Sequence, residues 1–261
     1  MPPVDRLYDV YIFDLDGTVY LGEALLPKAG ETITALRELG KRTLFLSNNP
    51  TRSARAYAAR LTGLGLPTPA SGVINSTDVL VALLQRELPG ATLFVAGETP
   101  LKRALLAAGF GLSEEARQVD AVIASFDRTF DYHKLQIAFD AISGGARFFA
   151  TNADRYCPVP GGGQPDAAAI IAAIEACTGK QVEAVAGKPS PLMAKAVLHL
   201  AAAAPADCLM TGDRLETDVL MALNAGMASA LTLTGATSRA ELEASEIQPA
   251  YVIESLGELL P

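Results

Sequence analysis

The sequence has little cysteine, an excess of acidic over basic residues and no long apolar run, and each shortage excludes a class of protein. The three cysteines, Cys157, Cys177 and Cys208, stand far apart without Cys-x-x-Cys spacing, which argues against a disulfide scaffold and a cysteine-based metal site. The net charge of −8 argues against a nucleic-acid partner. No apolar run reaches the about 18 residues of a membrane span, so no membrane partner is expected.

Other familiar signals are also missing. The N-terminus reads MPPVDRLYD, with prolines and acids before any apolar segment, so we expect no secretory signal and a cytoplasmic location. No G-x-x-x-x-G-K-[ST] motif occurs, which leaves an ATP-cleaving P-loop unsupported. We expect residues 161–163 to form a flexible loop rather than a phosphate cradle, and His133 and His199, which lie in helical patterns, to be structural.

The most informative segment that is present is Val10–Tyr20, VYIFDLDGTVY. Its first four residues, Val10–Phe13, are all apolar or aromatic and predict a strand buried on both faces. Asp14 and Asp16 follow at the carboxyl end, where alternate residues point to the same side, and Gly17 permits a tight turn. Two acids this close suit a hard cation such as Mg²⁺. A bare D-x-D is equally compatible with a helix cap and a solvated turn residue.

Along the rest of the chain, strand patterns alternate with helix patterns, which predicts parallel βαβ units and an α/β fold. A Pro/Gly-rich loop is expected at 157–165. The expected strands are 43–46, 72–75, 92–96, 121–126, 147–150, 182–186, 208–210, 228–233 and 251–253; the expected helices are 32–39, 53–64, one from about 76, 100–108, 132–142, 167–177, 192–203 and 217–223.

Four segments place polar residues directly after an apolar strand pattern, so parallel strands would bring them to one edge of the sheet. The set is typical of phosphoryl transfer. Each member has an ordinary alternative as a strand-end turn residue, a surface lysine or a loop acid, so the case depends on their joint occurrence. The four groups are Asp14 with Asp16, Ser47 with Asn48, Lys188, and Asp213 with Asp218.

Roles can be assigned from the chemistry of each side chain. Asp14 is the expected nucleophile, because a carboxylate can form an aspartyl-phosphate. Asp16 is expected to protonate the leaving alcohol and then deprotonate the water. Ser47 and Asn48 would bind phosphate oxygens, and Lys188 would both bind phosphate and supply the positive charge that lets one anion attack another.

The expected metal site uses the acids again. Asp213 would complete a Mg²⁺ site begun by Asp14 and Asp16, and Asp218, one helical turn further on, would orient metal-bound water.

These residues resemble the haloacid dehalogenase superfamily, in its type IIA branch of p-nitrophenylphosphatase-like and N-acetylglucosamine-phosphate phosphatase-like sugar phosphatases. The similarity runs from about residue 8 almost to the C-terminus. The matching segments are FDLDGTVY (13–20), LSNNPTRS (46–53), AGKPSP (186–191) and GDRLETD (212–218), supported by ATNAD (150–154) and LTLTGATSRAEL (231–242).

The resemblance implies a Rossmann-like core of residues 1–80 and 181–261 and an inserted α/β cap of residues 81–180. It implies Mg²⁺ held by Asp14, the backbone carbonyl of Asp16, and Asp213, and phosphatase rather than dehalogenase activity. The expected substrates are small phosphomonoesters, with sugar or polyol phosphates favoured over phosphoglycolate, nucleotides or pyridoxal phosphate. Homo-oligomerisation is left open, as are two rival functions: a non-catalytic phospho-ligand binding module and a phosphotransferase or mutase.

The cap is expected to bind the leaving group of the substrate and so to determine substrate specificity. Many relatives have Gly-x-Gly where this chain has Pro165-Asp166-Ala167-Ala168, so the cap pocket cannot be copied from them. We expect Asp166 to cap a helix, with substrate contact as the alternative. The candidate substrate contacts are Asn152, Asp154 and Arg155, together with Tyr156 and Arg128, of which Arg128 could equally form a surface ion pair.

Overall fold

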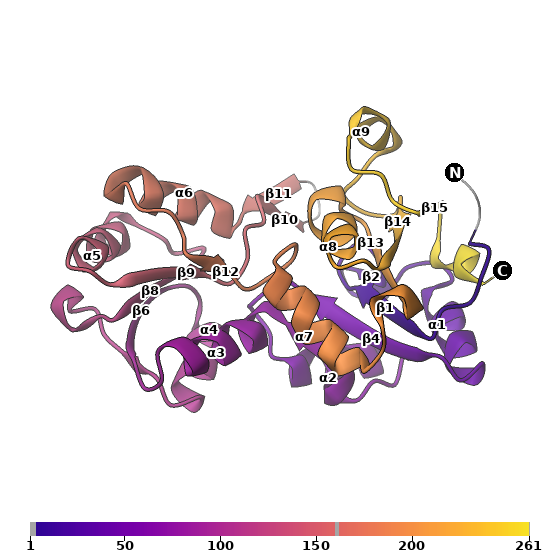
Figure 1. Ribbon diagram of the computed structural model, residues 1–261, viewed down its shortest axis with the longest axis horizontal. Coiled ribbons are helices and arrows are strands. Elements are labelled where there is room, and N and C mark those ends of the chain that lie inside the picture. Colours follow the sequence, from indigo (N-terminus) through magenta and orange to yellow (C-terminus); the bar gives the residue numbers. More distant parts are fainter. Residues whose placement is uncertain (1–3, 160–161, 261) are drawn as a thin grey trace. The chain divides into compact units, whose positions relative to one another are not determined.

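The computed structural model describes residues 4–159 and 162–260, and it divides the chain into two compact units (Figure 1). The first contains residues 1–47, 54–74 and 188–261, and the second contains 48–53 and 75–187. Each has its own parallel sheet, as the α/β prediction requires. Among the described residues no helix is both long enough and apolar enough to span a membrane.

The first unit is built on a six-stranded sheet with the strand order β15-β14-β13-β1-β4-β5. Strand β1 pairs in parallel with β4 and β13, and β14 pairs in parallel with β13 and β15. The strands are β1 (Val10–Asp14), β4 (Arg42–Ser47), β5 (Val73–Asn75), β13 (Cys208–Gly212), β14 (Ala228–Thr232) and β15 (Tyr251–Ile253). The helices are α1 (Ala29–Glu38), α2 (Ala54–Gly63), α7 (Pro191–Ala201), α8 (Leu220–Asn224) and α9 (Arg239–Ala244).

Strand β1 is buried along its whole length, as its apolar sequence predicts. The Tyr11 and Phe13 rings stack with centroids 6.3 Å apart, and Phe13 lies 5.9 Å from Phe45 of β4. This aromatic row packs against Ile33 and Leu36 of α1. The core therefore fixes the strand whose last residue is Asp14.

The second unit contains a five-stranded parallel sheet with the order β12-β9-β8-β6-β7. Figure 1 shows α5 and α6 on one side of this sheet and α3 with α4 on the other. The strands are β6 (Thr92–Ala96), β7 (Gly111–Leu112), β8 (Ala121–Ala124), β9 (Arg147–Ala150) and β12 (Ala184–Val185); the helices are α3 (Ser76–Glu87), α4 (Thr99–Ala107), α5 (Tyr132–Ser143) and α6 (Ala167–Thr178).

Two antiparallel hairpins were not predicted. Strands β2 (Tyr20–Leu21) and β3 (Ala24–Leu25) pair directly after the D-x-D segment. Strands β10 (Tyr156–Val159) and β11 (Gly162–Pro165) occupy the stretch expected to be a loop, so that expectation is wrong. A Cβ at Gly163 would lie 2.7 Å from Cδ2 of Tyr156, so the missing side chain makes room for the ring. Gly161, also expected in that loop, lies outside the described residues.

Two further expectations are corrected. Residues 182–186, grouped with the last part of the chain, supply β12, which pairs with β9 of the second sheet. Lys188 therefore does not follow a strand of the six-stranded sheet. The helix expected at 217–223 begins earlier, with a π-helical turn at Leu215–Val219 that continues into α8. In that turn the Val219 N–H donates to the Arg214 carbonyl, five residues back.

Candidate active site

The site is centred on a buried lysine between two aspartates. Lys188 Nζ donates to Asp14 Oδ1 at 2.5 Å and to Asp218 Oδ1 at 2.6 Å. Asp14 ends β1, Asp218 lies in the π-helical turn, and Lys188 lies three residues before the start of α7. All three side chains are almost fully buried. The lysine thus reaches the carboxyl end of β1 although its own preceding strand belongs to the other sheet.

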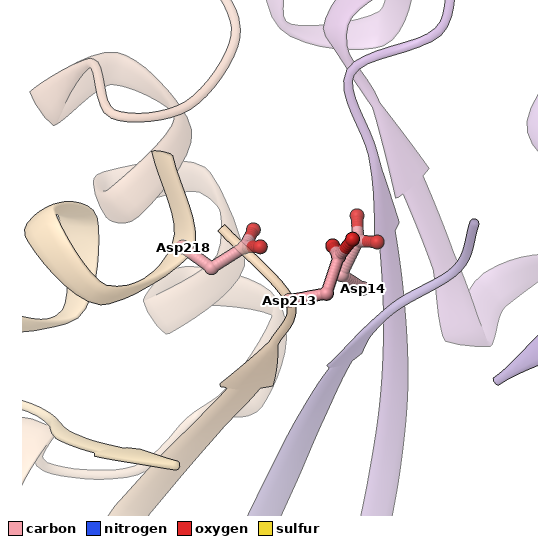
Figure 2. A group of neighbouring side chains, drawn as sticks. All are labelled: Asp14, Asp213 and Asp218. Carbon is pink, nitrogen blue, oxygen red and sulfur yellow. The ribbon is translucent and has the colours of Figure 1, made fainter. Parts of the chain in front are cut away.

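A third carboxylate, that of Asp213, completes the cluster. Figure 2 shows the carboxylates of Asp14 and Asp213 side by side, with the Asp218 carboxylate pointing toward them. One oxygen from each of the three lies within 4.8 Å of the others. Three negative charges and one ammonium leave this buried cluster with two negative charges in excess. Oxygen ligands and that charge fit a hard divalent cation.

Glycines make room for these acids. Gly17 has φ +88°, and a Cβ there would stand 2.5 Å from Asp213 Oδ2. A Cβ at Gly235 would overlap the same carboxylate, and one at Gly212 would overlap Asp218. The Ala236 N–H donates to Asp213 Oδ2 at 2.6 Å. On this side the Asp213 carboxylate therefore packs against backbone atoms instead of side chains.

The electrostatics reflect the crowding of like charges. Burial, followed by Asp218 and Asp213, raises the pKa of Asp14 well above its ordinary value, although Lys188 opposes this effect. Burial and Asp218 raise the pKa of Asp213 to about 6. Burial lowers the pKa of a lysine, but Asp14 and Asp218 outweigh it and raise the pKa of Lys188 above its ordinary value. The ammonium is therefore a fixed positive charge.

Asp16 stands apart from the three-carboxylate cluster. Its side chain is half-buried, and its backbone bridges to Tyr20 at the start of the β2–β3 hairpin. The Tyr20 hydroxyl lies 3.5 Å from Asp16 Oδ2, the long limit of a hydrogen bond. Burial, then Asp16, raises the pKa of Tyr20 far above its ordinary value, so the hydroxyl keeps its proton.

Two of the three residues expected to bind phosphate, Ser47 and Asn48, lie in different units. Ser47 is the last residue of β4 and is buried; Asp14 pairs with Leu46, so Ser47 lies at the same end of the sheet as Asp14. Asn48 belongs to the second unit. Its side-chain amide donates to Asp154 Oδ1 at 3.1 Å, and its backbone carbonyl accepts from Ser76 Oγ at 2.6 Å.

The candidate substrate contacts of the second unit have different surroundings. Asn152 is fully buried, and its amide donates to Asp154 Oδ2 at 3.2 Å and to Asp166 Oδ1 at 3.0 Å. Asp166 caps α6, as predicted, by accepting from the Ala167 N–H. Arg155 is exposed.

Three other residues considered from the sequence lie on the surface of their units. Arg128 forms a two-pronged ion pair with Glu98, at 2.6 and 2.8 Å, which matches the surface-pair alternative. His133 on α5 and His199 on α7 are exposed.

Three residues that contact Asp16 or lie around Asp213 were not predicted from the sequence: Tyr20, Gly235 and Ala236. A signal existed for each, because Tyr20 closes the segment FDLDGTVY and the other two lie within LTLTGATSRAEL, both of which carry the family resemblance. What the sequence could not supply was the contact with Asp16 or Asp213.

Two family models match the chain, one in each half of the sequence. Residues 11–111 match a model described as haloacid dehalogenase-like hydrolase, and residues 185–259 match one described as HAD-hydrolase-like. The sugar-phosphatase AraL of Bacillus subtilis is 36% identical over 248 residues, which cover 95% of this chain and 90% of that protein.

Comparison with solved structures identifies phosphatases as well. A 4-nitrophenylphosphatase from Thermotoga maritima superposes with a TM-score of 0.91 at 36% identity, covering 97% of this chain and 96% of that one. The chain belongs to the type IIA branch of the haloacid dehalogenase superfamily. As a member of this family it has the Rossmann-like core with an added cap, and it is a phosphoric monoester hydrolase.

A relative also bears on the metal. The glycerol phosphate phosphatase of Mycobacterium tuberculosis, solved in complex with magnesium, has a TM-score of 0.88 and 31% identity, covering 99% of this chain and 78% of that one. Phosphatases of the haloacid dehalogenase superfamily use a divalent metal, and the cluster of Asp14, Asp213 and Asp218 has the donors to hold one.

Proposed function

We propose that this protein is a Mg²⁺-dependent phosphatase that hydrolyses small phosphomonoesters through an aspartyl-phosphate intermediate. One observation carries the proposal: the Lys188 ammonium bonds Asp14 and Asp218 while Asp213 lies within reach of both carboxylates. A nucleophilic carboxylate needs a fixed cation to approach an anionic phosphate, and this arrangement supplies it.

The first half-reaction transfers the phosphoryl group to the enzyme. An Asp14 oxygen attacks phosphorus, the bond to the leaving alcohol breaks, and Asp16 gives its proton to the departing oxygen. Ser47 and Asn48, with Lys188, bind the phosphate oxygens. The separation of Asp16 from the three-carboxylate cluster supports its role, because a proton donor must face the leaving group rather than the metal.

The second half-reaction returns the enzyme to its starting state. Water attacks phosphorus, Asp16 accepts the proton, and the bond to Asp14 breaks to release inorganic phosphate. Mg²⁺, held by Asp14, the Asp16 carbonyl and Asp213, would neutralise phosphate charge in both halves. Asp218 holds Lys188 and would orient water on the metal.

The proposed substrates are sugar or polyol phosphates. The names of the Bacillus sugar phosphatase and the Mycobacterium glycerol phosphate phosphatase support this class. We place substrate recognition in the second unit as the cap, with Asn152, Asp154 and Arg155 as its candidate residues. Because Asn152 is fully buried, the exposed Arg155 is the better placed to meet a ligand.

The decisive variant is Asp14→Asn. It should abolish release of 4-nitrophenol from 4-nitrophenyl phosphate while the circular dichroism spectrum and urea midpoint stay close to wild type. Retained turnover in a folded variant would refute the assigned nucleophile.

Two further measurements test the rest of the proposal. Chelation should silence the enzyme and Mg²⁺ restore it, whereas activity that survives thorough chelation would count against the metal. Free phosphate released from a panel of phosphomonoesters without an acceptor distinguishes hydrolysis from transfer, and the panel should include phosphoglycolate, nucleotides and pyridoxal phosphate.

A further inference from the structure

The β2–β3 hairpin, which begins four residues after Asp16, is fastened to α2 by one arginine. The Arg60 guanidinium lies over the Tyr20 ring, with 4.6 Å between its central carbon and the ring centroid. Its Nη2 donates to the Gly22 carbonyl in the hairpin turn and lies 3.5 Å from Glu23 Oε1. The Arg60 side chain is 16% exposed and Tyr20 is 1% exposed, so the contact with the ring is made largely out of water, whereas Glu23 is 91% exposed.

Tyr20 of the hairpin contacts residues 15–17 at three points, one of which is its own N–H, which donates to the Leu15 carbonyl at 3.2 Å. The Gly17 N–H donates to the Tyr20 carbonyl at 2.9 Å, which closes the turn. The Tyr20 hydroxyl lies 3.5 Å from Asp16 Oδ2, and Tyr20 itself is fully buried. The ring therefore has the guanidinium on its face and the carboxylate at its hydroxyl end.

Asp16 is the residue whose placement needs this support. Its side chain is half-buried and lies outside the Lys188-bonded carboxylate cluster. A proton donor in catalysis works only when its oxygen is held within reach of the leaving oxygen. The Tyr20 ring, held on one face by Arg60, restricts the conformations available to the Asp16 carboxylate.

We propose that Arg60 and Tyr20 are positioning residues that together hold the Asp16 carboxylate for proton transfer to the leaving group. This inference rests on the proposed function, in which Asp16 is the general acid. The alternative is that Arg60 only stabilises the hairpin and has no bearing on proton transfer.

Two aryl phosphates of nearly the same shape separate these alternatives. 4-Nitrophenolate leaves readily without a proton, whereas phenolate gains more from one. The leaving-group ratio is kcat/KM for 4-nitrophenyl phosphate divided by kcat/KM for phenyl phosphate, measured on the full chain with Mg²⁺. It reports proton donation during transfer to Asp14, while a loss of folded protein lowers both values equally.

The variants remove one part of the assembly at a time. Tyr20→Phe deletes the hydroxyl and keeps the ring; Arg60→Gln deletes the cation and Arg60→Lys retains it. Asp16→Asn is the benchmark for complete loss of the acid. One control, Arg55→Gln, changes an exposed arginine on the same helix. The other control is Tyr8→Phe, which removes a buried hydroxyl that bonds to Tyr251 instead of Asp16.

We expect Asp16→Asn to widen the leaving-group ratio, that is, to raise it by about tenfold or more, because phenyl phosphate loses more rate than 4-nitrophenyl phosphate. Tyr20→Phe and Arg60→Gln should widen it by about fivefold, the equivalent of one modest hydrogen bond. Arg60→Lys should recover part of that change, and both controls should keep the wild-type ratio. The inference is overturned if Asp16→Asn widens the ratio while Tyr20→Phe and Arg60→Gln do not. If Asp16→Asn also leaves it unchanged, the acid role of Asp16 in the proposed function fails first, and the inference fails with it.

Discussion

Replacing Lys188 by methionine should destabilise the metal-free protein far more than an ordinary lysine substitution. The ammonium bonds two of the three buried carboxylates, so its loss leaves the three acids without the cation that pairs with Asp14 and Asp218. Removing one partner of a buried ion pair costs about 3–5 kcal/mol. Because Lys188 serves two partners at once, we expect the upper part of that range, about 4–5 kcal/mol of unfolding free energy.

The assay is urea denaturation near neutral pH with a chelator present, compared with Lys195→Met, which changes an exposed lysine on α7, the helix that begins three residues after Lys188. The control should stay within about 0.5 kcal/mol of wild type. Adding Asp218→Asn to Lys188→Met removes one repelling charge and should restore about 1–3 kcal/mol. A Lys188→Met protein as stable as the control would refute the view that this ammonium compensates the buried acids.

Two other predictions test the surroundings of the site and the second unit. Gly235→Ala should weaken Mg²⁺ binding, measured by calorimetry, because the new Cβ would displace the Asp213 carboxylate, whereas Gly63→Ala, which points into open space, should leave binding unchanged. Asp127→Asn should lower the urea midpoint at neutral pH. Although burial opposes it, hydrogen bonding to Lys134 and Thr129 lowers the pKa of Asp127, so the stability it contributes is present above its ordinary pKa and is lost as the pH falls through its lower folded value. The difference between Asp127→Asn and wild type should therefore shrink in acid, and a constant difference would exclude the ion pair as its source.

The pattern of hydrophobic residues predicted the core of the fold, because the residues that a strand or helix buries are the apolar ones. Strand β1 is apolar at four consecutive residues and is buried along its length, and the alternation of strands with helices correctly indicated an α/β protein. Gly179 ends α6 in the left-handed conformation that favours glycine.

The errors have a common physical origin in contacts between distant residues. Periodicity assigned the strand before Lys188 to the wrong sheet, because an apolar run does not reveal its pairing partner. The β10–β11 hairpin was mistaken for a loop because Gly163 makes room for the Tyr156 ring on the paired strand, and the sequence does not reveal this contact. The π-helical turn was missed because the Asp218 carboxylate accepts from the Arg214 N–H and competes with regular helix.

The candidate site shows the same limit. The residue types after β1 and β13 predicted which acids to consider, and the structure brings Asp14, Asp213 and Asp218 together with Lys188. Sequence alone did not indicate that Asp16 would stand apart beside Tyr20, because that placement depends on the β2–β3 hairpin.

The central claim is tested most directly by acid-quenching the enzyme during turnover of a phosphomonoester labelled in its phosphoryl group, with Mg²⁺ present, and locating the label by peptide mapping. We predict label on the peptide that contains Asp14, appearing before free phosphate and absent from Asp14→Asn. Label on a different peptide, or steady turnover with no labelled enzyme at any time, would contradict the account.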